Sequence, residues 1–293
     1  MDPDLSTPLI SIVMPLYNAT GTVELAIMSI INQTFHDWEL IVLDDGSTDQ
    51  GPDLVKSIKD PRIRFFQDPV NRGISYRLNK GIDLAHGKYF ARMDSDDIAF
   101  PQRLEKQFDY LKNNPEVDLL ATGILFFDNN GHAKGVMPVK ETHKDICSTP
   151  WNGFYMPHPT WMGRIEWFKS NRYRSIADKA EDQDLLFRTY QTSCFACLPD
   201  ILLGYRQDHR SFSKLFKARR VLAKSIVKTA IAKNKFNILC FIIVITFFKI
   251  IADFFNLYLG FDKLRNKLCT IPSDTNLEWQ KIHQSFIGQL EKT

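Results

Sequence analysis

The sequence predicts an α/β fold: a single domain in which a mixed, mostly parallel sheet is covered by helices on both faces. Segments with the periodicity of strands and of helices alternate through the first half of the 293 residues. The predicted strands are almost continuously apolar, as strands of a parallel sheet covered on both faces are. Polar clusters directly follow three of these strands, and ligands of such sheets bind beyond the carboxyl ends of the strands. Together these observations predict a nucleotide-binding site at one edge of the sheet.

The elements follow in order along the chain. Apolar runs predict strands at residues 9–17, 38–43, 62–66, 88–93, 117–127 and 195–205. Apolar residues three and four positions apart predict helices at residues 23–31, 73–85, 101–113 and 181–190. Residues 139–180 are rich in aromatic residues, proline and histidine and have weak periodicity, which predicts a long binding loop.

The polar clusters at the predicted strand ends are Tyr17-Asn18, Asp44-Asp45 and Met93-Asp-Ser-Asp-Asp97. The last places three carboxylates within four positions, and alternate side chains of an extended segment point the same way. Convergent carboxylates repel one another unless a hard cation such as Mg²⁺ or Mn²⁺ accepts their oxygen atoms. The cluster therefore predicts a divalent metal that holds a diphosphate.

Composition and cysteine usage narrow the class of protein. The apolar and charged fractions, 44% and 24%, are those of a globular protein. The five cysteines are scattered, which predicts a reducing compartment. The one close pair, Cys194 and Cys197, is predicted to lie on a half-buried strand rather than to bind zinc or to act in redox chemistry.

The C-terminal third carries an uneven charge. Nine Lys or Arg residues and no acidic residue lie between 210 and 235, and an apolar segment, 236–259, follows. Within it Thr246, Lys249 and Asp253 fall on one polar stripe, so we expect the segment to lie in a membrane interface rather than to span it. A buried helix of a soluble domain is the alternative. The basic arm predicts an anionic membrane surface as a partner, and most of it lacks the interleaved aromatic residues of nucleic-acid binders.

Several short motifs stand in a fixed order. They are Ile10-Ser-Ile-Val-Met-Pro-Leu-Tyr-Asn18, Asp44-Asp-Gly-Ser-Thr-Asp49, Asn71-Arg-Gly73, Met93-Asp-Ser-Asp-Asp97, Pro101-Gln-Arg-Leu104, His158-Pro-Thr160, Glu181-Asp182 and Tyr205-Arg206. This set resembles the inverting glycosyltransferases of family two, in particular the bacterial branch that builds surface polysaccharides. The resemblance covers residues 8–212 and implies the GT-A fold, a single Rossmann-like domain that binds a nucleotide sugar.

The resemblance also implies roles for individual residues. The residues that would contact the nucleotide sugar are Pro15, Tyr17, Asn18, Asp44, Asp45, Asn71, Asp94 and Arg206. Among them, Asp45 would accept a hydrogen bond from the base edge. Asp96 would be the main ligand of the Mg²⁺ or Mn²⁺ ion, with Asp94 beside it and His209 as a further candidate.

Asp182 would be the catalytic base, and Glu181 and Asp184 compete with it. The alternative is that none of the three is catalytic, because acidic residues at the start of a helix are stabilised by its positive end in any protein. The sequence leaves two roles for Asp97: it would either support the metal ligands from behind or cap the next helix. His158 and Trp161 are open between contact with the acceptor and packing in the core.

These expectations combine into one functional hypothesis. The chain would transfer a sugar from a nucleotide-sugar donor, a UDP-sugar first, to a lipid-linked or other glycan acceptor, peripherally or monotopically at the cytoplasmic face of the plasma membrane. The expected segments are a catalytic domain at 1–212, a basic amphipathic arm at 213–235, an apolar membrane-associating helix at 236–261 and a tail at 262–293. The alternatives are a non-catalytic nucleotide-sugar-binding subunit and, less favoured, a nucleic-acid-binding protein.

Overall fold

A computed structural model of the chain describes residues 7–207, 212–232, 244, 247–252, 255 and 269–290. Its strands are β1 (Ile10–Leu16), β2 (Trp38–Asp44), β3 (Ile63–Phe66), β4 (Tyr89–Arg92), β5 (Ile98–Ala99), β6 (Leu119–Phe127), β7 (Ala133–Val136), β8 (Met162–Arg164) and β9 (Phe195–Arg206). Its α-helices are α1 (Val23–Ile31), α2 (Gly51–Ser57), α3 (Ile74–Leu84), α4 (Arg103–Asn113), α5 (His143–Ile146), α6 (Ile165–Ser170), α7 (Glu181–Thr189), α8 (Phe212–Ala232) and α11 (Ser273–Leu290). Three 3₁₀ turns are η1 (Pro150–Asn152), η2 (His158–Thr160) and η3 (Ser175–Ala177).

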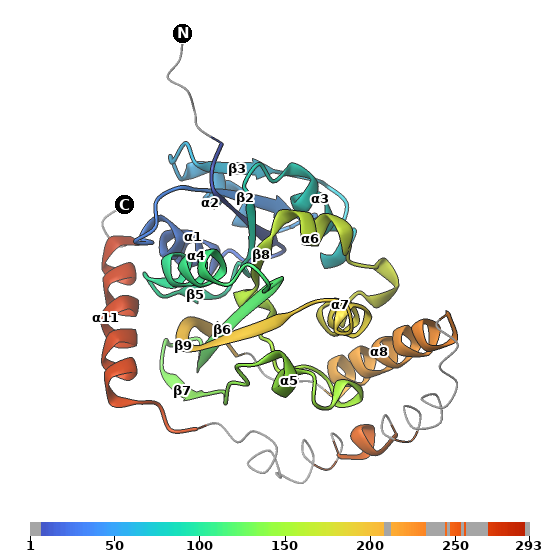
Figure 1. Cartoon of the computed structure of the whole chain (residues 1–293). Coiled ribbons are helices and arrows are strands. Elements are labelled where there is room, and N and C mark those ends of the chain that lie inside the picture. The colour runs from blue at the N-terminus through green and yellow to red at the C-terminus, as the bar shows by residue number, and fades with distance from the viewer. Residues whose placement is uncertain are drawn as a thin grey trace.

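The strands form one mixed sheet in the order β3-β2-β1-β4-β8-β6-β9-β5, with β7 paired to β6 (Figure 1). Parallel pairings join β3 to β2, β2 to β1, β1 to β4 and β6 to β9, and they contain most of the paired positions. β8 runs antiparallel to both of its neighbours, β4 and β6. The predicted mixed, mostly parallel sheet is therefore confirmed.

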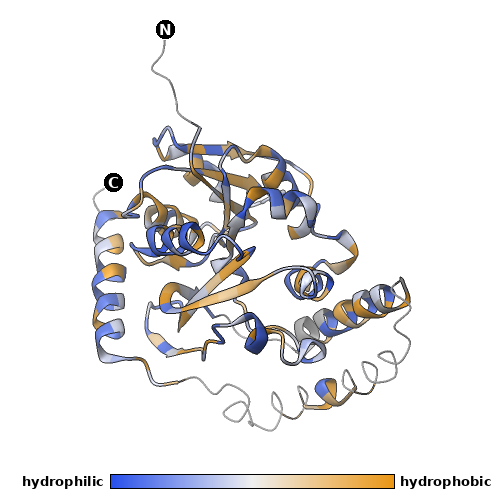
Figure 2. Ribbon diagram, in the orientation of Figure 1, coloured by the Kyte–Doolittle hydropathy of each residue, from blue (hydrophilic) through white to orange (hydrophobic). Residues whose placement is uncertain are grey.

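The two faces of the sheet are covered by different helices. Side chains alternate across a strand, so Ile12 and Met14 of β1 pack with α1 and α4 on one face. Val13 points to the other face and packs with residues of α3, α6 and α7. In Figure 2 the ribbon of β9 has mainly the colour of hydrophobic residues, whereas that of α4 is mainly blue, the colour of hydrophilic residues.

The predicted strands and helices of residues 9–127 and 181–206 are present, with ends shifted by up to two residues. The sequence analysis omitted α2, β5 and β7. It treated the whole of 139–180 as a loop, although that region contains β8, α5, α6 and the three 3₁₀ turns. β5 and β8 have only two and three residues. Such short strands are too brief for an alternation of apolar and polar residues to be visible.

The prediction that the cysteine pair lies on a strand is confirmed for Cys197 and wrong for Cys194. Cys197 is buried in β9 and Cys194 lies just before it. Burial raises the pKa of both thiols, that of Cys197 to about 12, so neither is a ready thiolate. Among the described residues, the one group whose ligand atoms converge on a possible metal position is the aspartate cluster, and it contains no cysteine.

The basic arm is helix α8, and it packs against α7 (Figure 1). Arg174 joins the two helices: its guanidinium pairs with Asp184 of α7 and donates hydrogen bonds to Ser225 and Thr229 of α8. On the opposite side of α8 an exposed basic stripe remains, consisting of Lys217, Arg220, Lys224 and Lys228. The arm therefore has one docked side and one solvent side.

The segment expected to associate with a membrane, 236–261, lies mostly outside the described residues. No helix within the described part of the chain combines the length and the apolar character needed to cross a bilayer.

The predicted tail contains helix α11, which packs along the end of the sheet beside α1 (Figure 1). Trp279 is 1% exposed, its ring lies 4.7 Å from that of Phe127, and its Nε1 donates a 2.9 Å hydrogen bond to the Gly131 carbonyl. Gly204 of β9 leaves room for the indole, because a Cβ there would lie 2.2 Å from a ring atom. α11 thus supports the strand that ends at Arg206.

Candidate active site

The polar clusters that follow β1, β2 and β4 meet at one edge of the sheet, because these three strands are parallel neighbours. β8 is antiparallel to both β4 and β6, so β6 and β9 point the same way as β4. Their carboxyl ends add Asn129 and Arg206 to the same edge. The residues just before β8 reach this edge as well, since an antiparallel strand presents its start where its neighbours end.

A cavity of about 670 Å³ lies at this edge, and we call it the strand-end cavity. The residues predicted from sequence that line it are Pro15, Tyr17, Asn18, Asp45, Asn71, Asp94, Asp96 and Arg206. Asp44 does not line it: that side chain is 1% exposed and accepts a hydrogen bond from the Ser47 backbone, which fixes the turn after β2. His209 lies outside the described residues.

Asp45 organises the floor of the strand-end cavity. Its carboxylate accepts hydrogen bonds from the backbone N–H groups of Arg72 (2.8 Å) and Gly73 (3.0 Å) and from Nε of the buried Arg77 (2.6 Å). The Asn71-Arg72-Gly73 motif is thus a turn held on a carboxylate. Contact between Asp45 and a base edge stays a prediction.

Gly73 begins helix α3 with a positive φ of 86°, a conformation that favours glycine. Because this position has no side chain to cap the helix, Asp178 does so from 103 positions away in the sequence, accepting a 3.0 Å hydrogen bond from the Ser75 N–H. A Cβ at residue 73 would lie 2.2 Å from the Asp178 carboxylate. Glycine therefore allows the loop before α7 to close against the strand-end cavity.

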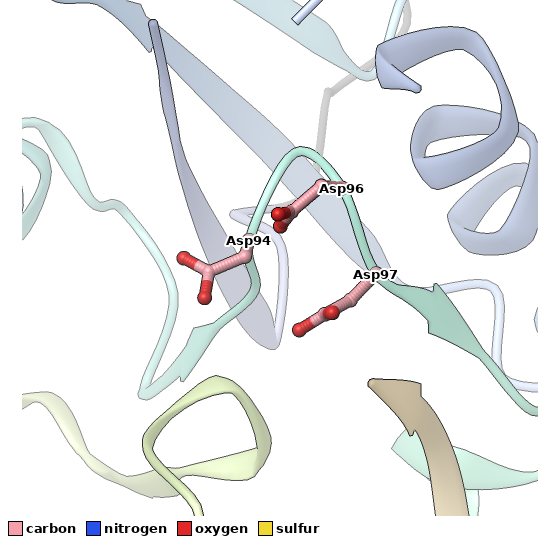
Figure 3. A group of neighbouring side chains, drawn as sticks. All are labelled: Asp94, Asp96 and Asp97. Carbon is pink, nitrogen blue, oxygen red and sulfur yellow. The ribbon is translucent and has the colours of Figure 1, made fainter. Parts of the chain in front are cut away.

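The acidic loop after β4 turns so that Asp96 and Asp97 project toward the side on which Asp94 lies (Figure 3). One ligand atom from each carboxylate lies within 4.8 Å of the others. Burial and repulsion from Asp94 raise the pKa of Asp96 to about 6 and that of Asp97 well above its usual range. A set of oxygen donors that repel one another fits a hard divalent cation such as Mg²⁺ or Mn²⁺.

Asp97 has a different environment from the other two acids. It is 1% exposed, and one carboxylate oxygen accepts a 2.9 Å hydrogen bond from the Arg206 N–H. The other oxygen is buried and has no hydrogen-bond partner among the described residues. Gln102 occupies the position before α4, so Asp97 is not the helix cap. It ties the acidic loop to the end of β9 and keeps one oxygen open for a cation.

A second cavity, of about 780 Å³, lies at the start of α7, and we call it the helix-end cavity. Asp182 and Glu181 line it from α7, and the segment 152–159 lines it from the loop before β8. Apolar side chains form another part of its wall, among them Ile124, Phe126, Met137, Phe154, Met156 and Leu222. The cavity therefore combines carboxylates with an apolar surface.

Both acids at the start of α7 are hard to ionise. Burial raises the pKa of Asp182, whose carboxylate accepts a 3.2 Å hydrogen bond from the Gln183 side chain. Burial and the neighbouring Asp182 raise the pKa of Glu181 to about 7. A carboxylate whose pKa lies near neutrality is suited to accept a proton during a reaction.

The third acid of α7, Asp184, does not line either cavity. It is 1% exposed and is held by Arg174, by Arg188 (3.0 Å) and by the Ser225 hydroxyl. Asp184 therefore joins α7 to α8, and Asp182 and Glu181 remain as the acids that face a cavity.

His158 lines the helix-end cavity, whereas Trp161 is fully buried in the core. The His158 ring lies against Trp161, with 4.4 Å between the centroids, and its Nε2 is 2.9 Å from the Tyr173 hydroxyl. Burial and the charge of Arg92 lower the pKa of His158 well below its usual range. The imidazole is therefore neutral at physiological pH.

Arg92 and Asp94 line both cavities, so they form the partition between them. Sequence reasoning missed Arg92, and it also missed Arg77 and Asp178. The sequence did contain a signal for the two arginines. Arg92 stands inside the apolar run of β4 and Arg77 on the buried side of α3, and a charged residue is rarely buried unless it pairs with an opposite charge or binds a ligand. Asp178 had no such signal, because its partner is remote in the sequence.

Comparisons with known proteins agree with this geometry. A family model described as "Glycosyl transferase family 2" matches residues 11–172. An uncharacterized glycosyltransferase of Methanocaldococcus jannaschii is 33% identical over 233 residues, which span 77% of this chain and 80% of that protein. A UDP-Glc:alpha-D-GlcNAc-diphosphoundecaprenol beta-1,3-glucosyltransferase of Escherichia coli is 35% identical over 140 residues, which span 47% of this chain and about half (54%) of that protein.

The fold also matches solved structures. A mannosyltransferase from Pyrobaculum calidifontis, solved in complex with GDP-Man and Mn²⁺, superposes with a TM-score of 0.57. The superposition covers 76% of this chain and 64% of that one at 16% sequence identity. At this identity the match concerns the fold alone, which is GT-A-like.

Proposed function

The chain belongs to glycosyl transferase family 2, and from this premise we propose that it moves a sugar from a nucleotide-diphosphate sugar to an acceptor hydroxyl with inversion. One observation carries the proposal: two cavities at the same sheet edge share Arg92 and Asp94 as their partition. In an inverting displacement the nucleophile and the leaving group lie on opposite sides of the anomeric carbon. A sugar at the partition would have its leaving group in the strand-end cavity and its acceptor in the helix-end cavity.

The strand-end cavity is the proposed donor site. Tyr17, Asn18 and Asp45 would hold the nucleoside, and the diphosphate would lie near Asp96 and Arg206. A Mg²⁺ or Mn²⁺ ion held by Asp94 and Asp96 would act as a Lewis acid on the departing diphosphate. Support comes from the convergent carboxylates and from the Mn²⁺ in the Pyrobaculum structure.

The helix-end cavity is the proposed acceptor site, with Asp182 as the general base. As the acceptor oxygen attacks the anomeric carbon, the bond from that carbon to the phosphate oxygen breaks and the acceptor proton passes to the Asp182 carboxylate. Such a base typically contributes 10²–10⁴-fold to a rate. Glu181, in the same cavity, is the remaining competitor for this role.

We further propose a UDP-sugar donor and a lipid-linked glycan acceptor. The E. coli relative is named for a UDP-sugar donor and a diphosphoundecaprenol-linked acceptor. The apolar wall of the helix-end cavity suits an acceptor that carries a lipid. The same acceptor places the protein at the cytoplasmic face of the plasma membrane.

The basic stripe of α8, Lys217, Arg220, Lys224 and Lys228, is the proposed contact with anionic headgroups, worth about 1 kcal/mol per residue near the surface. Flotation of the full chain with anionic and with neutral liposomes tests this contact. We expect flotation with anionic liposomes, and weaker flotation when Lys217, Lys224 and Lys228 are replaced by Glu. Equal flotation of that variant and the wild type would show that the stripe is not the contact.

The decisive experiment is a donor screen. The purified chain is incubated with a panel of nucleotide sugars and Mn²⁺, and release of the nucleoside diphosphate is measured. We expect hydrolysis of one donor, loss of hydrolysis in EDTA, and loss in Asp96→Asn but not in Asp53→Asn, an exposed control on α2. Full activity in the chelator would refute the metal. Donor binding without hydrolysis or transfer would favour the non-catalytic binding subunit.

A further inference from the structure

Arg92 is a buried arginine whose hydrogen-bonding capacity is only partly used. It is 3% exposed, and its Nη2 pairs with Asp94. Its Nε and Nη1 have no hydrogen-bond partner among the described residues. Buried donors in native proteins are rarely left open, and an open donor on a charged group costs more than one on a neutral group. The N–H groups on these two nitrogen atoms therefore need an oxygen atom that the described part of the chain does not supply.

The position of Arg92 limits what can supply that oxygen. The side chain lines both the strand-end and the helix-end cavity. If the first holds the nucleoside diphosphate and the second holds the acceptor, the one group that must touch both is the sugar being moved. A nucleotide alone would reach Asp96 and Arg206, which line the strand-end cavity only.

The charge around Arg92 limits the ligand further. The guanidinium is paired with Asp94, so the pair presents donors without a net positive charge. The backbone of Arg92 is also fixed: its carbonyl accepts a hydrogen bond from Arg103, and its N–H donates a 2.9 Å bond to the Trp161 carbonyl. The Arg92–Asp94 ion pair as a whole is neutral, and its N–H donors are held rigidly. Such donors suit the hydroxyl oxygen atoms of a ligand rather than a carboxylate.

We propose that Arg92 binds hydroxyl groups of the transferred sugar and thereby determines which neutral sugar the enzyme accepts. This inference rests on the proposed function, because it requires a nucleotide sugar in the strand-end cavity. It assigns to Arg92 a hydrogen bond donated to a sugar oxygen atom, which the ionised carboxylates of the neighbouring acids cannot donate. A site built to donate hydrogen bonds to a hydroxyl discriminates strongly against a substrate that lacks it.

The test compares the affinity for a nucleotide with that for a nucleotide sugar. The probes are UDP, the UDP-sugar that the wild type hydrolyses fastest, and the monodeoxy analogues of that sugar, titrated calorimetrically with Mn²⁺. For the wild type we expect at least one monodeoxy analogue to bind about 10- to 100-fold more weakly than its parent, the effect of losing a hydrogen bond to a charged group. For Arg92→Lys we expect UDP affinity within about threefold of the wild type and no discrimination between parent and analogue.

Arg64→Lys is the matched control. Arg64 is a partly buried arginine on β3 that pairs with Glu39 and lines neither cavity, so this variant should keep the wild-type pattern. If Arg92→Lys discriminates against the deoxy analogue as the wild type does, the inference is overturned. If Arg92→Lys fails to fold, the wild-type series alone decides, since equal binding of all monodeoxy analogues would also overturn it. A wild type that binds neither UDP nor any nucleotide sugar would instead overturn the proposed function.

Discussion

The two cavities of this protein are built in different ways. The strand-end cavity is formed largely by residues that directly follow apolar strands, such as Tyr17, Asp45 and Asp96. The helix-end cavity is formed by the segment 152–159, by the start of α7 and by one side of α8, which are joined only by tertiary contacts. A cavity of the first kind is encoded locally, whereas one of the second kind depends on how distant segments pack.

The electrostatics of the cavities differ in the same sense. The strand-end cavity is lined by four carboxylates together with Arg77 and Arg206, a set suited to a charged diphosphate and its cation. The helix-end cavity has two carboxylates of raised pKa beside an apolar wall.

The largest expected effect is a loss of transfer that leaves the affinity for UDP nearly unchanged. Asp182→Asn should lower transfer by about 10²–10⁴-fold, because the amide cannot accept the acceptor proton. UDP affinity, a property of the strand-end cavity, should stay within about twofold. Steady-state transfer and calorimetric UDP binding measure the two quantities.

Glu181→Gln is the matched control for that variant, since it removes a charge from the same cavity. It should lower transfer by less than Asp182→Asn does. The reverse order would move the base assignment to Glu181.

The next effect is the dependence of transfer on pH. A base must be ionised to accept a proton, and burial raises the pKa of both acids at the start of α7, that of Glu181 to about 7. Transfer should therefore fall as the pH is lowered, in a range above the ordinary pKa of an aspartate if Asp182 is the base and near neutrality if Glu181 is, approaching tenfold per pH unit once the base is mostly protonated. The logarithm of kcat/KM against pH measures this limb.

Two variants sharpen the pH experiment. Glu181→Gln should retain an acidic limb, and Asp182→Asn should remove it from the residual rate. A wild-type profile that is flat from pH 5 to 8 would exclude Glu181 as the base, and a profile with no acidic limb at any pH at which the protein stays folded would contradict a carboxylate base in the helix-end cavity.

A smaller effect should appear in both cavities at once. Gly204→Ala would place a Cβ 2.2 Å from the Trp279 ring, and overpacking of this kind costs about 1–3 kcal/mol. Because β9 supplies Tyr205 to the helix-end cavity and Arg206 to the strand-end cavity, UDP binding and transfer should weaken together. Thermal unfolding measures the loss of stability.

The control is Gly288→Ala on α11 itself, where a Cβ meets no atom within 4 Å. Alanine favours a helix more than glycine does, so this variant should equal or exceed the wild type in stability. Equal unfolding temperatures for Gly204→Ala and the wild type would contradict the packing of α11 against β9.

The smallest expected effect concerns the link between the cavities. Asp178→Ala removes the remote cap of α3, at a cost of about 1 kcal/mol, the typical value for a helix cap. The loop that carries Asp178 leads directly into α7, so transfer should fall a few-fold more than UDP affinity. Asp178→Asn, whose amide oxygen can still accept from Ser75, should recover most of both; failure to recover would point to a role for the charge.

The success of the sequence reading follows the same division. The strands β1, β2 and β4 were predicted because continuous apolar runs identify buried parallel strands, and their carboxyl ends fixed the positions of Tyr17, Asp45 and Asp96. Residues 139–180 gave no periodic signal, so the sequence analysis missed β8 and the preceding segment 152–159, which lines the helix-end cavity. Asp44 was predicted to contact the nucleotide sugar together with Asp45 because the two are adjacent in the sequence. Only the conformation of the turn after β2 shows that Asp45 lines the cavity and Asp44 does not.

By itself the sequence determined the family, the α/β sheet and the carboxylates that follow its strands, because strand periodicity and strand-end position are local properties of the chain. The tertiary structure decided the rest. The antiparallel β8 places His158 at the helix-end cavity, and the ion pair with Arg174 holds Asp184 away from both cavities. Between the cavities, Nε and Nη1 of Arg92 have no hydrogen-bond partner in the described part of the chain. Each of these depends on partners remote in the sequence, and whether a buried charge is satisfied or open follows only from what packs against it.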